Sequence, residues 1–162
     1  MEECLVYPTN GVENRDDWAM RLALKEAAQA AAEGEVPIGA VLMQGDTVLA
    51  MAHNRREALD DVTSHAEIEA LRLAGKRKGD WRLRDCTLYV TLEPCPMCAG
   101  ALMAARVGRI VFGAKDAVAG AMGSVLNLPR FPLGASPKVE SGVLEEACRT
   151  LLRDFFQSRR KT

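Results

Sequence analysis

The feature that most constrains the fold of this chain is a pair of short motifs about thirty residues apart. An H-x-E motif occupies residues 65–67, and a P-C-x-x-C motif occupies residues 94–98. Imidazole and thiolate groups are common zinc ligands, so the fold has to bring His65 next to Cys95 and Cys98. Three protein ligands leave a tetrahedral zinc with one open position, which is typical of a catalytic site and not of a closed structural one.

Cys95 and Cys98 are three positions apart, so both sulfur atoms face the same side of a helix that begins there. Pro96 stands near the first turn of that helix, where proline is favoured. The positive end of the helix stabilises a thiolate over a thiol, and the thiolate is the form that binds a metal. A C-x-x-C pair alone is a weak signal, because redox pairs and halves of structural zinc sites share it.

His65 makes the zinc hypothesis specific. It is one of two histidines in the chain and stands at the expected start of a second helix, whose positive end disfavours protonation of the imidazole. Glu67 is the one group of the motif that can move protons. Side chains two residues apart on a helix point about 200° apart, so His65 and Glu67 reach one site only if it lies over the helix end. We therefore expect the two helix starts to face each other across the metal.

Other acidic and sulfur-bearing residues offer alternatives. Glu93 is a rival to Glu67 as the catalytic base, but Pro94 forces the backbone of Glu93 to be extended, and we interpret Glu93 as structural. A purely structural zinc site needs a fourth protein ligand, and the sequence leaves three candidates open for that position: His53, Cys4 and Cys86.

Helices are predicted at residues 17–34, 65–76, 96–106 and 143–157. Asp16 or Asp17 can cap the first of them, and Gly34 can end it. Thr63 or Ser64 can cap the second.

Strands are predicted at residues 38–43, 47–52, 87–92, 109–114 and 138–140. The first two flank a Gly-Asp turn, which indicates a hairpin. Residues 115–137 are rich in Gly and Pro, and we expect a loop there with one short helical turn. Strands that alternate with helices predict a layered α/β domain with a mixed sheet, in which the hairpin comes first and the crossovers follow.

The length of 162 residues suits a single domain, and no break in composition suggests two. Apolar runs are too short to span a membrane. Residues 1–15 lack the pattern of a secretory signal, and we expect them to form a flexible extension of a soluble, intracellular protein. The five cysteines are too few for a disulfide scaffold, and Cys86 and Cys148 are interpreted as small buried hydrophobic residues.

The net charge of −1 supplies no long-range attraction for nucleic acid. Any RNA binding must therefore depend on a local basic patch. The best candidate is the carboxy terminus, with Arg153 and residues 159–161. So short a run also fits a solvated tail.

Around the two motifs the chain resembles the bacterial-type tRNA adenosine deaminases. The resemblance runs from about Trp18 to Arg160. It rests on the zinc motif and on further stretches at residues 35–41, 54–55, 87–95, 97–101, 112–116 and 154–156. The zinc motif is shared by all deaminases of this fold, and the flanking stretches point to the tRNA enzymes. The resemblance implies a three-layer α/β/α fold of the cytidine deaminase-like type, with a mixed sheet of about five strands.

The resemblance also implies an activity, namely hydrolytic deamination of adenosine to inosine at the wobble position of a tRNA anticodon. One Zn²⁺ per subunit would be held by His65, Cys95 and Cys98. Water activated there would attack C6 of a flipped-out adenine. Glu67 would take the proton of the water, pass it to the ring nitrogen and then protonate the departing ammonia.

Substrate contacts and assembly follow from the same resemblance. Asn54 matches a residue of the family that hydrogen-bonds the flipped-out nucleoside, although a turn residue at a strand end would look the same. Asp116 would line the approach to the pocket. Members of the family are cytoplasmic homodimers with no membrane segment, and their second subunit helps to form the surface for the anticodon loop.

The chain departs from the family pattern in two places. Residues 61–64 read Asp-Val-Thr-Ser where the family usually has Asp-Pro-Thr-Ala, which keeps a helix cap. Residues 134–137 read Gly-Ala-Ser-Pro where the family often has Asn-His. The second departure affects contacts with the anticodon loop and leaves the deamination chemistry untouched.

Two other classes of function use the same ligands. A deaminase of a free base or nucleoside, such as guanine or cytosine, would keep the metal site. Cytidine deaminases, however, usually show Pro-Cys-Gly-x-Cys-Arg, which Pro96 does not match. A structural zinc or RNA-binding module would require the fourth ligand discussed above.

Overall fold

The computed structural model describes residues 3–11, 13–131, 133–134 and 136–160. Within these ranges one sheet has five strands in the order β2-β1-β3-β4-β5. The strands are β1 (Gly39–Gln44), β2 (Thr47–His53), β3 (Cys86–Leu92), β4 (Arg109–Ala114) and β5 (Lys138–Ser141). β1 runs antiparallel to both β2 and β3, whereas β3, β4 and β5 are parallel to one another. The predicted mixed sheet is therefore confirmed.

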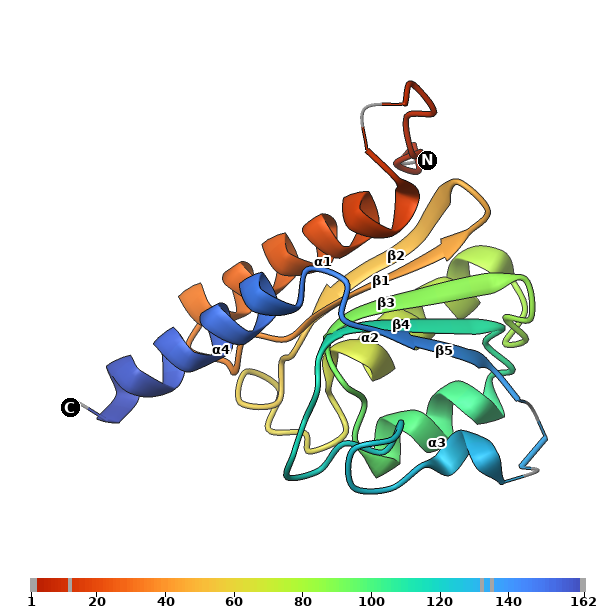
Figure 1. Cartoon of the computed structure of the whole chain (residues 1–162). Coiled ribbons are helices and arrows are strands. Elements are labelled where there is room, and N and C mark those ends of the chain that lie inside the picture. The colour runs from red at the N-terminus through yellow and green to blue at the C-terminus, as the bar shows by residue number, and fades with distance from the viewer. Residues whose placement is uncertain (1–2, 12, 132, 135, 161–162) are drawn as a thin grey trace.

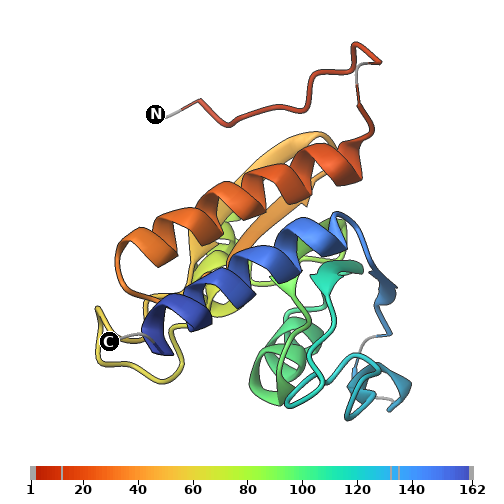
Figure 2. The same ribbon diagram turned by 60° about the vertical axis from the view of Figure 1, so that its left-hand side comes forward.

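Two layers of helices enclose the sheet (Figure 1). The helices α1 (Arg15–Ala32) and α4 (Glu145–Arg160) lie side by side on one face, as both views show (Figure 2). The helices α2 (Ala66–Lys78) and α3 (Pro96–Ala104) pack against each other, and their buried residues join the core on the other face. This is the expected three-layer α/β/α arrangement.

Strand β3 divides the core into two parts, because successive side chains of a strand point to opposite faces. Leu88 and Val90 belong to the cluster beneath α2 and α3, and Tyr89 belongs to the cluster beneath α1 and α4. The close approach of α1 to the sheet depends on Gly39. A Cβ atom on Gly39 would lie 1.9 Å from the carbonyl oxygen of Ala23.

The first helix begins earlier than predicted, and its cap is a different residue. The side chain of Asn14 accepts a hydrogen bond from the backbone N–H of Asp17 at 2.9 Å, so Asn14 is the N-cap. Asp16 cannot serve as the cap because its carboxylate binds the guanidinium of Arg109 at 2.6 Å and the hydroxyl of Tyr89 at 2.7 Å. The carboxylate of Asp16 is thus engaged by a residue 93 positions away in sequence and not by the first turn of its own helix.

The second helix also begins at an unexpected residue. Neither Thr63 nor Ser64 is its cap; the N-cap is His65, which has extended backbone angles. The hydroxyl of Thr63 instead donates to Asp61 at 2.6 Å. The cap prediction was wrong: the Thr63 hydroxyl is bound to Asp61 in the preceding loop, and no side chain caps the helix.

Part of the amino-terminal extension lies against the hairpin. The N–H of Val48 donates to the carbonyl of Leu5, and the N–H of Tyr7 donates to the carbonyl of Asp46, each at 2.8 Å. This segment covers one end of β2, which is an edge strand of the sheet. The expected flexibility of residues 1–15 stays a prediction, and residues 1, 2 and 12 lie outside the described part.

The long segment between β4 and β5 contains one short helical turn, η1 (Leu128–Arg130), as predicted. Of the unusual stretch at 134–137, Ala135 lies outside the described residues. Among the described helices, none has the length and the apolar character needed to cross a membrane.

Candidate active site

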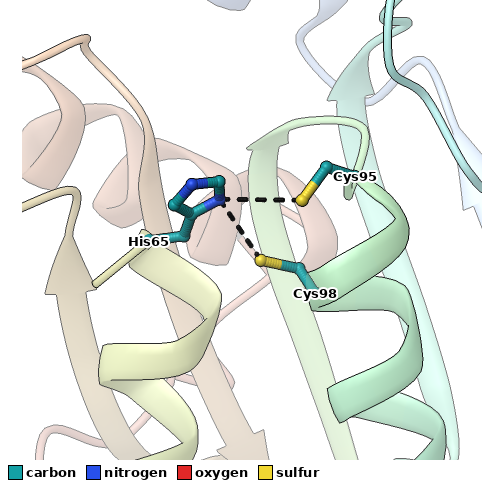
Figure 3. Close-up of side chains that lie close together, drawn as sticks. All are labelled: His65, Cys95 and Cys98. Atoms are coloured by element: carbon teal, nitrogen blue, oxygen red, sulfur yellow. Dashed lines mark hydrogen bonds between the residues drawn. The ribbon is translucent and has the colours of Figure 1, made fainter. Parts of the chain in front are cut away.

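His65, Cys95 and Cys98 come together at one end of the sheet (Figure 3). Nδ1 of His65 lies 3.7 Å from Sγ of Cys95 and 3.5 Å from Sγ of Cys98. A tetrahedral zinc with Zn–S bonds of about 2.3 Å and a Zn–N bond of about 2.0 Å places nitrogen and sulfur ligands about 3.5 Å apart. The three donors therefore fit a zinc ion, with Nδ1 as the imidazole ligand.

The helix starts explain how these side chains become available. His65 is the N-cap of α2, and Cys95 is the N-cap of α3, but neither side chain caps its own helix. Their backbone carbonyls still accept the first helical hydrogen bonds, from Glu69 and Ala99 at 3.0 and 2.8 Å. Both side chains are thus turned away from their helices and toward each other, as expected for two helix starts that face a metal.

The electrostatics of the group favour one thiolate. A hydrogen bond from Cys98 lowers the pKa of Cys95 to about 4, and His65 acts in the same direction. The same contact, together with burial, raises the pKa of the Cys98 thiol. The contact with Cys95 also raises the pKa of His65. The three groups share protons among themselves, and a divalent cation would displace those protons.

Glu67 lies in the first turn of α2 with only 4% of its surface exposed. Burial raises the pKa of its carboxyl group to about 7. Glu67 interacts electrostatically with His65 and Cys95 and is hydrogen-bonded with Cys98, so it borders the three ligands. It is not one of the three converging ligands, which leaves its carboxylate available for another role.

Asn54 follows the last residue of β2 and is buried. Its Nδ2 donates to the carbonyl of Val36 at 3.4 Å, and its Oδ1 accepts from the N–H of Arg56 at 3.1 Å. The N–H of Arg55 donates to the carbonyl of Ser64 at 3.0 Å. That bond joins the residues that follow Asn54 and precede His65, so it brings Asn54 to the same end of the sheet as the metal ligands.

Asp116 lies in the turn that follows β4. Its Oδ1 accepts from the N–H groups of Val118 and Ala119 at 3.0 and 3.1 Å, which organises the turn after β4. Its own N–H donates to Oε1 of Glu93 at 3.1 Å. The role of Asp116 in lining the approach to a pocket stays a prediction.

Glu93 has the contacts of a structural residue, as interpreted from the sequence. Its Oε2 accepts from the N–H groups of Met122 and Ser124 at 3.0 and 3.1 Å. Both oxygens are therefore used to hold the loop after β4. A buried carboxylate engaged in this way is not free to act as a base.

One buried carboxylate was missed by the sequence reasoning. Glu35 is 1% exposed, and its oxygens accept hydrogen bonds from the N–H groups of Glu57 and Ala58. The sequence feature that could have indicated its burial is its position directly before the apolar run that leads into β1. Such a residue needs a buried partner once the strand is packed.

No fourth protein ligand joins the group within the described residues. His53 lies between Glu26 and Glu33 at 2.6 and 2.8 Å. Cys86 opens β3, whereas Cys95 follows the end of that seven-residue strand. The arrangement is that of an open, three-ligand site.

Three comparisons place the chain among known proteins. A family model described as MafB19-like deaminase matches residues 13–160. The tRNA-specific adenosine deaminase of Bacillus subtilis (strain 168) is 49% identical over 150 residues, which cover 91% of this chain and 92% of that protein. A solved structure from a study of A-to-I editing by tRNA:A34 deaminases at the wobble position of transfer RNA is 44% identical, with a TM-score of 0.81, and the match covers 83% of this chain and 99% of that one.

A guanine deaminase from Nitrosomonas europaea shares the fold at a TM-score of 0.76 but is only 25% identical, over 94% of this chain and 87% of that one. The higher identities are with the tRNA enzymes, over nearly the whole of both chains. The chain therefore belongs to the family of tRNA-specific adenosine deaminases.

Proposed function

We propose that this protein hydrolytically deaminates adenosine to inosine at the wobble position of a tRNA anticodon, with one zinc ion per chain. The observation that carries the proposal is the three-ligand group of His65, Cys95 and Cys98, bordered by the buried Glu67. This combination of an open metal site and a neighbouring carboxylate is the arrangement used by nucleobase deaminases.

His65, Cys95 and Cys98 hold the metal, which when bound supplies Lewis-acid activation of a water molecule. Glu67 would accept one proton of the attacking water as the bond from the water oxygen to C6 forms, and would deliver that proton to N1 of the adenine ring. It would then carry the second proton, from the hydroxyl group now on C6, to the exocyclic amine, so that the C6–N bond breaks and water and adenosine yield inosine and ammonia. Because Glu67 is buried, the proton that it carries is shielded from bulk solvent.

Asn54 binds the flipped-out nucleoside in this proposal. Its amide is held by Val36 and Arg56, yet each polar atom keeps capacity for one more hydrogen bond. Asp116 contributes less directly, by fixing the turn that follows β4 along the approach to the site.

The RNA surface extends beyond the site. Arg153 and Arg160 are exposed on α4, while Arg159 donates to the carbonyl of Gly34 at 2.7 Å. Lys161 lies outside the described residues. Because the net charge of the chain is −1, local cations of this kind have to supply the attraction for phosphate.

A homodimer that acts in the cytoplasm completes the proposal. Several hydrophobic side chains between β4 and β5 are exposed, among them Val118, Val125, Leu126, Phe131 and Leu133. Exposed apolar residues of one segment are typical of subunit interfaces. Light scattering should give twice the mass of the chain, and a single-chain mass at micromolar concentration would contradict the dimer.

The alternative substrate class is a free base or nucleoside of the guanine or cytosine type. The metal ligands would be the same, so the site geometry does not separate the two classes. The relation to the tRNA enzymes is the observation against this alternative. The guanine deaminases of Nitrosomonas europaea and Bacillus subtilis are 25% and 34% identical to this chain, while the tRNA enzymes reach 44–49%.

The deciding experiment offers the zinc-loaded protein several substrates in parallel. An anticodon stem-loop with adenosine at the wobble position should be converted to inosine. A matched stem-loop with adenosine moved to the next loop position should react much more slowly, as should free adenosine, guanine and cytosine. Faster conversion of a free base than of the stem-loop would overturn the assignment, and a Glu67→Ala variant supplies the background rate.

A further inference from the structure

One buried carboxylate outside the group formed by His65, Cys95 and Cys98 (the metal group) binds the loop that joins Asn54 to His65. Glu35 lies between α1 and β1 and is 1% exposed. Its Oε1 accepts from the N–H of Glu57 at 2.9 Å, and its Oε2 accepts from the N–H of Ala58 at 2.8 Å. We propose that Glu35 is a positioning residue for substrate binding, which fixes residues 54–64 (the substrate loop) in the shape that recognises RNA. This inference rests on the proposed function.

The contacts require a carboxylate. Two N–H groups of the substrate loop point at two different oxygen atoms of Glu35. A carboxylate accepts at both oxygens, whereas an amide offers one oxygen and turns its NH₂ group toward the second N–H donor. Hydrogen bonds from backbone N–H groups to an ionised acceptor are short and strong, and they offset the cost of burying the charge.

The hydrogen bonds connect Glu35 to Asn54. Val36, the neighbour of Glu35, accepts from Nδ2 of Asn54, and the N–H of Arg56, next to Glu57, donates to Oδ1 of Asn54. These two contacts set which end of the amide carries the donor and which carries the acceptor. A shift of the backbone at residues 57–58 would therefore change the orientation of the amide.

The metal ligands are held mainly by their own helices. Glu69 bonds back to the carbonyl of His65 in the first turn of α2, and Ala99 does the same for Cys95 in α3. His65 also contacts the substrate loop, because its N–H donates to the carbonyl of Thr63 at 2.8 Å, but Thr63 lies five residues beyond Ala58, the last residue that Glu35 binds. Loss of the Glu35 contacts should thus disturb substrate binding and leave the metal group in place.

The test compares Glu35→Gln with a matched control outside the substrate loop, Glu140→Gln. Both variants remove one negative charge with almost no change in shape. Glu140 lies on β5 with its side chain 50% exposed, and it pairs with Arg109 of the neighbouring strand. Zinc content, and KM and kcat for the wobble-adenosine stem-loop, are measured for both variants and the wild type.

Glu35→Gln should raise KM about tenfold or more, the scale expected when a charged hydrogen bond is lost and a donor is left unpaired. Its zinc content should remain that of the wild type, with kcat within about threefold. Glu140→Gln should behave as the wild type. An unchanged KM for Glu35→Gln, a fall confined to kcat, or loss of zinc would overturn the inference.

A second measurement does not depend on activity. Amide hydrogen exchange of residues 55–64 should be faster in Glu35→Gln than in the wild type and unchanged in Glu140→Gln. If the wild type deaminates no RNA, the proposed function fails. The exchange result still shows whether Glu35 holds the substrate loop in place. If Glu35→Gln does not fold, Glu35→Asp is used, which keeps both acceptors but is one methylene shorter. It should show the same two effects, and normal KM and exchange in Glu35→Asp would overturn the inference.

Discussion

Nδ1 of His65 lies 3.5 Å from Sγ of Cys98, although 33 residues separate them in the chain. The contact exists because α2 and α3 both begin at the same end of the sheet, and because the residue at each helix start leaves its side chain uncapped. The metal group is thus a product of two local backbone conformations brought together by the sheet.

Replacing Cys98 should abolish metal binding. The Cys98→Ala variant keeps two of three ligands, and its zinc content should fall from about one ion per chain to nearly none, measured by elemental analysis after purification with zinc present. Cys148→Ala is the matched control, because Cys148 is also buried but packs against Gly113 in the core cluster beneath α1 and α4, on the other face of the sheet from α2 and α3. Full zinc occupancy in Cys98→Ala would contradict the ligand assignment.

Replacing Glu67 should separate metal binding from turnover. Glu67→Ala is expected to retain zinc and to lose at least about 10²-fold in kcat, the usual scale for a general acid–base group. Glu69→Ala removes the next acidic residue of the same helix, which pairs with Arg72 at 3.4 Å, and should be nearly as active as the wild type. Near-normal turnover by Glu67→Ala would exclude its role in proton transfer.

His53 should make stability depend on pH. Burial opposes its protonation, but hydrogen bonds to Glu26 and Glu33 outweigh burial and raise its pKa above the ordinary value of 6.5. Its contribution to stability is therefore fully present below pH 6.5 and is lost as the pH rises through the folded-state pKa.

Urea unfolding of the wild type and of His53→Asn between pH 5.5 and 9 measures this effect. The free-energy difference between the two proteins should be largest at the acidic end and should shrink as the pH rises. A difference that is constant across this range would show that His53 contributes no charged interaction.

Gly39 should tolerate no side chain. In Gly39→Ala the new Cβ would lie 1.9 Å from the carbonyl of Ala23 and 2.6 Å from the backbone nitrogen of Ala27. Forcing α1 away from the sheet should reduce the free energy of unfolding by about 1–3 kcal/mol or more. Gly75→Ala, where the nearest atom would be 3.9 Å away, should instead gain up to about 1 kcal/mol from helix propensity. Equal melting temperatures for the two variants would refute this packing argument.

The elements that carry local signals could be predicted from the sequence. Strand β4 has the predicted limits, Arg109–Ala114, because an apolar run there is bounded by polar and small residues. The convergence of His65, Cys95 and Cys98 was also predictable. Their side chains are common metal ligands, and the residues next to them in sequence indicate that each motif begins a helix. Their convergence required only that two helix starts meet.

Long-range contacts could not be predicted in the same way. Asp16 binds Arg109 while Asn14 caps α1, and the local sequence contains no pattern that predicts the pairing of Asp16 with Arg109. Glu35 binds backbone N–H groups, which every residue except proline possesses. The sequence therefore cannot indicate which residues Glu35 contacts. The roles of Asn54 and Asp116 are still predictions.

The hydrogen bond between Arg55 and Ser64 fastens the two ends of the substrate loop to each other. A loop closed at its base can change length at small entropic cost, and the strand before it and the helix after it need not move. Residues inside the loop can therefore be exchanged, or added, without moving the helix start that presents His65 to Cys95 and Cys98.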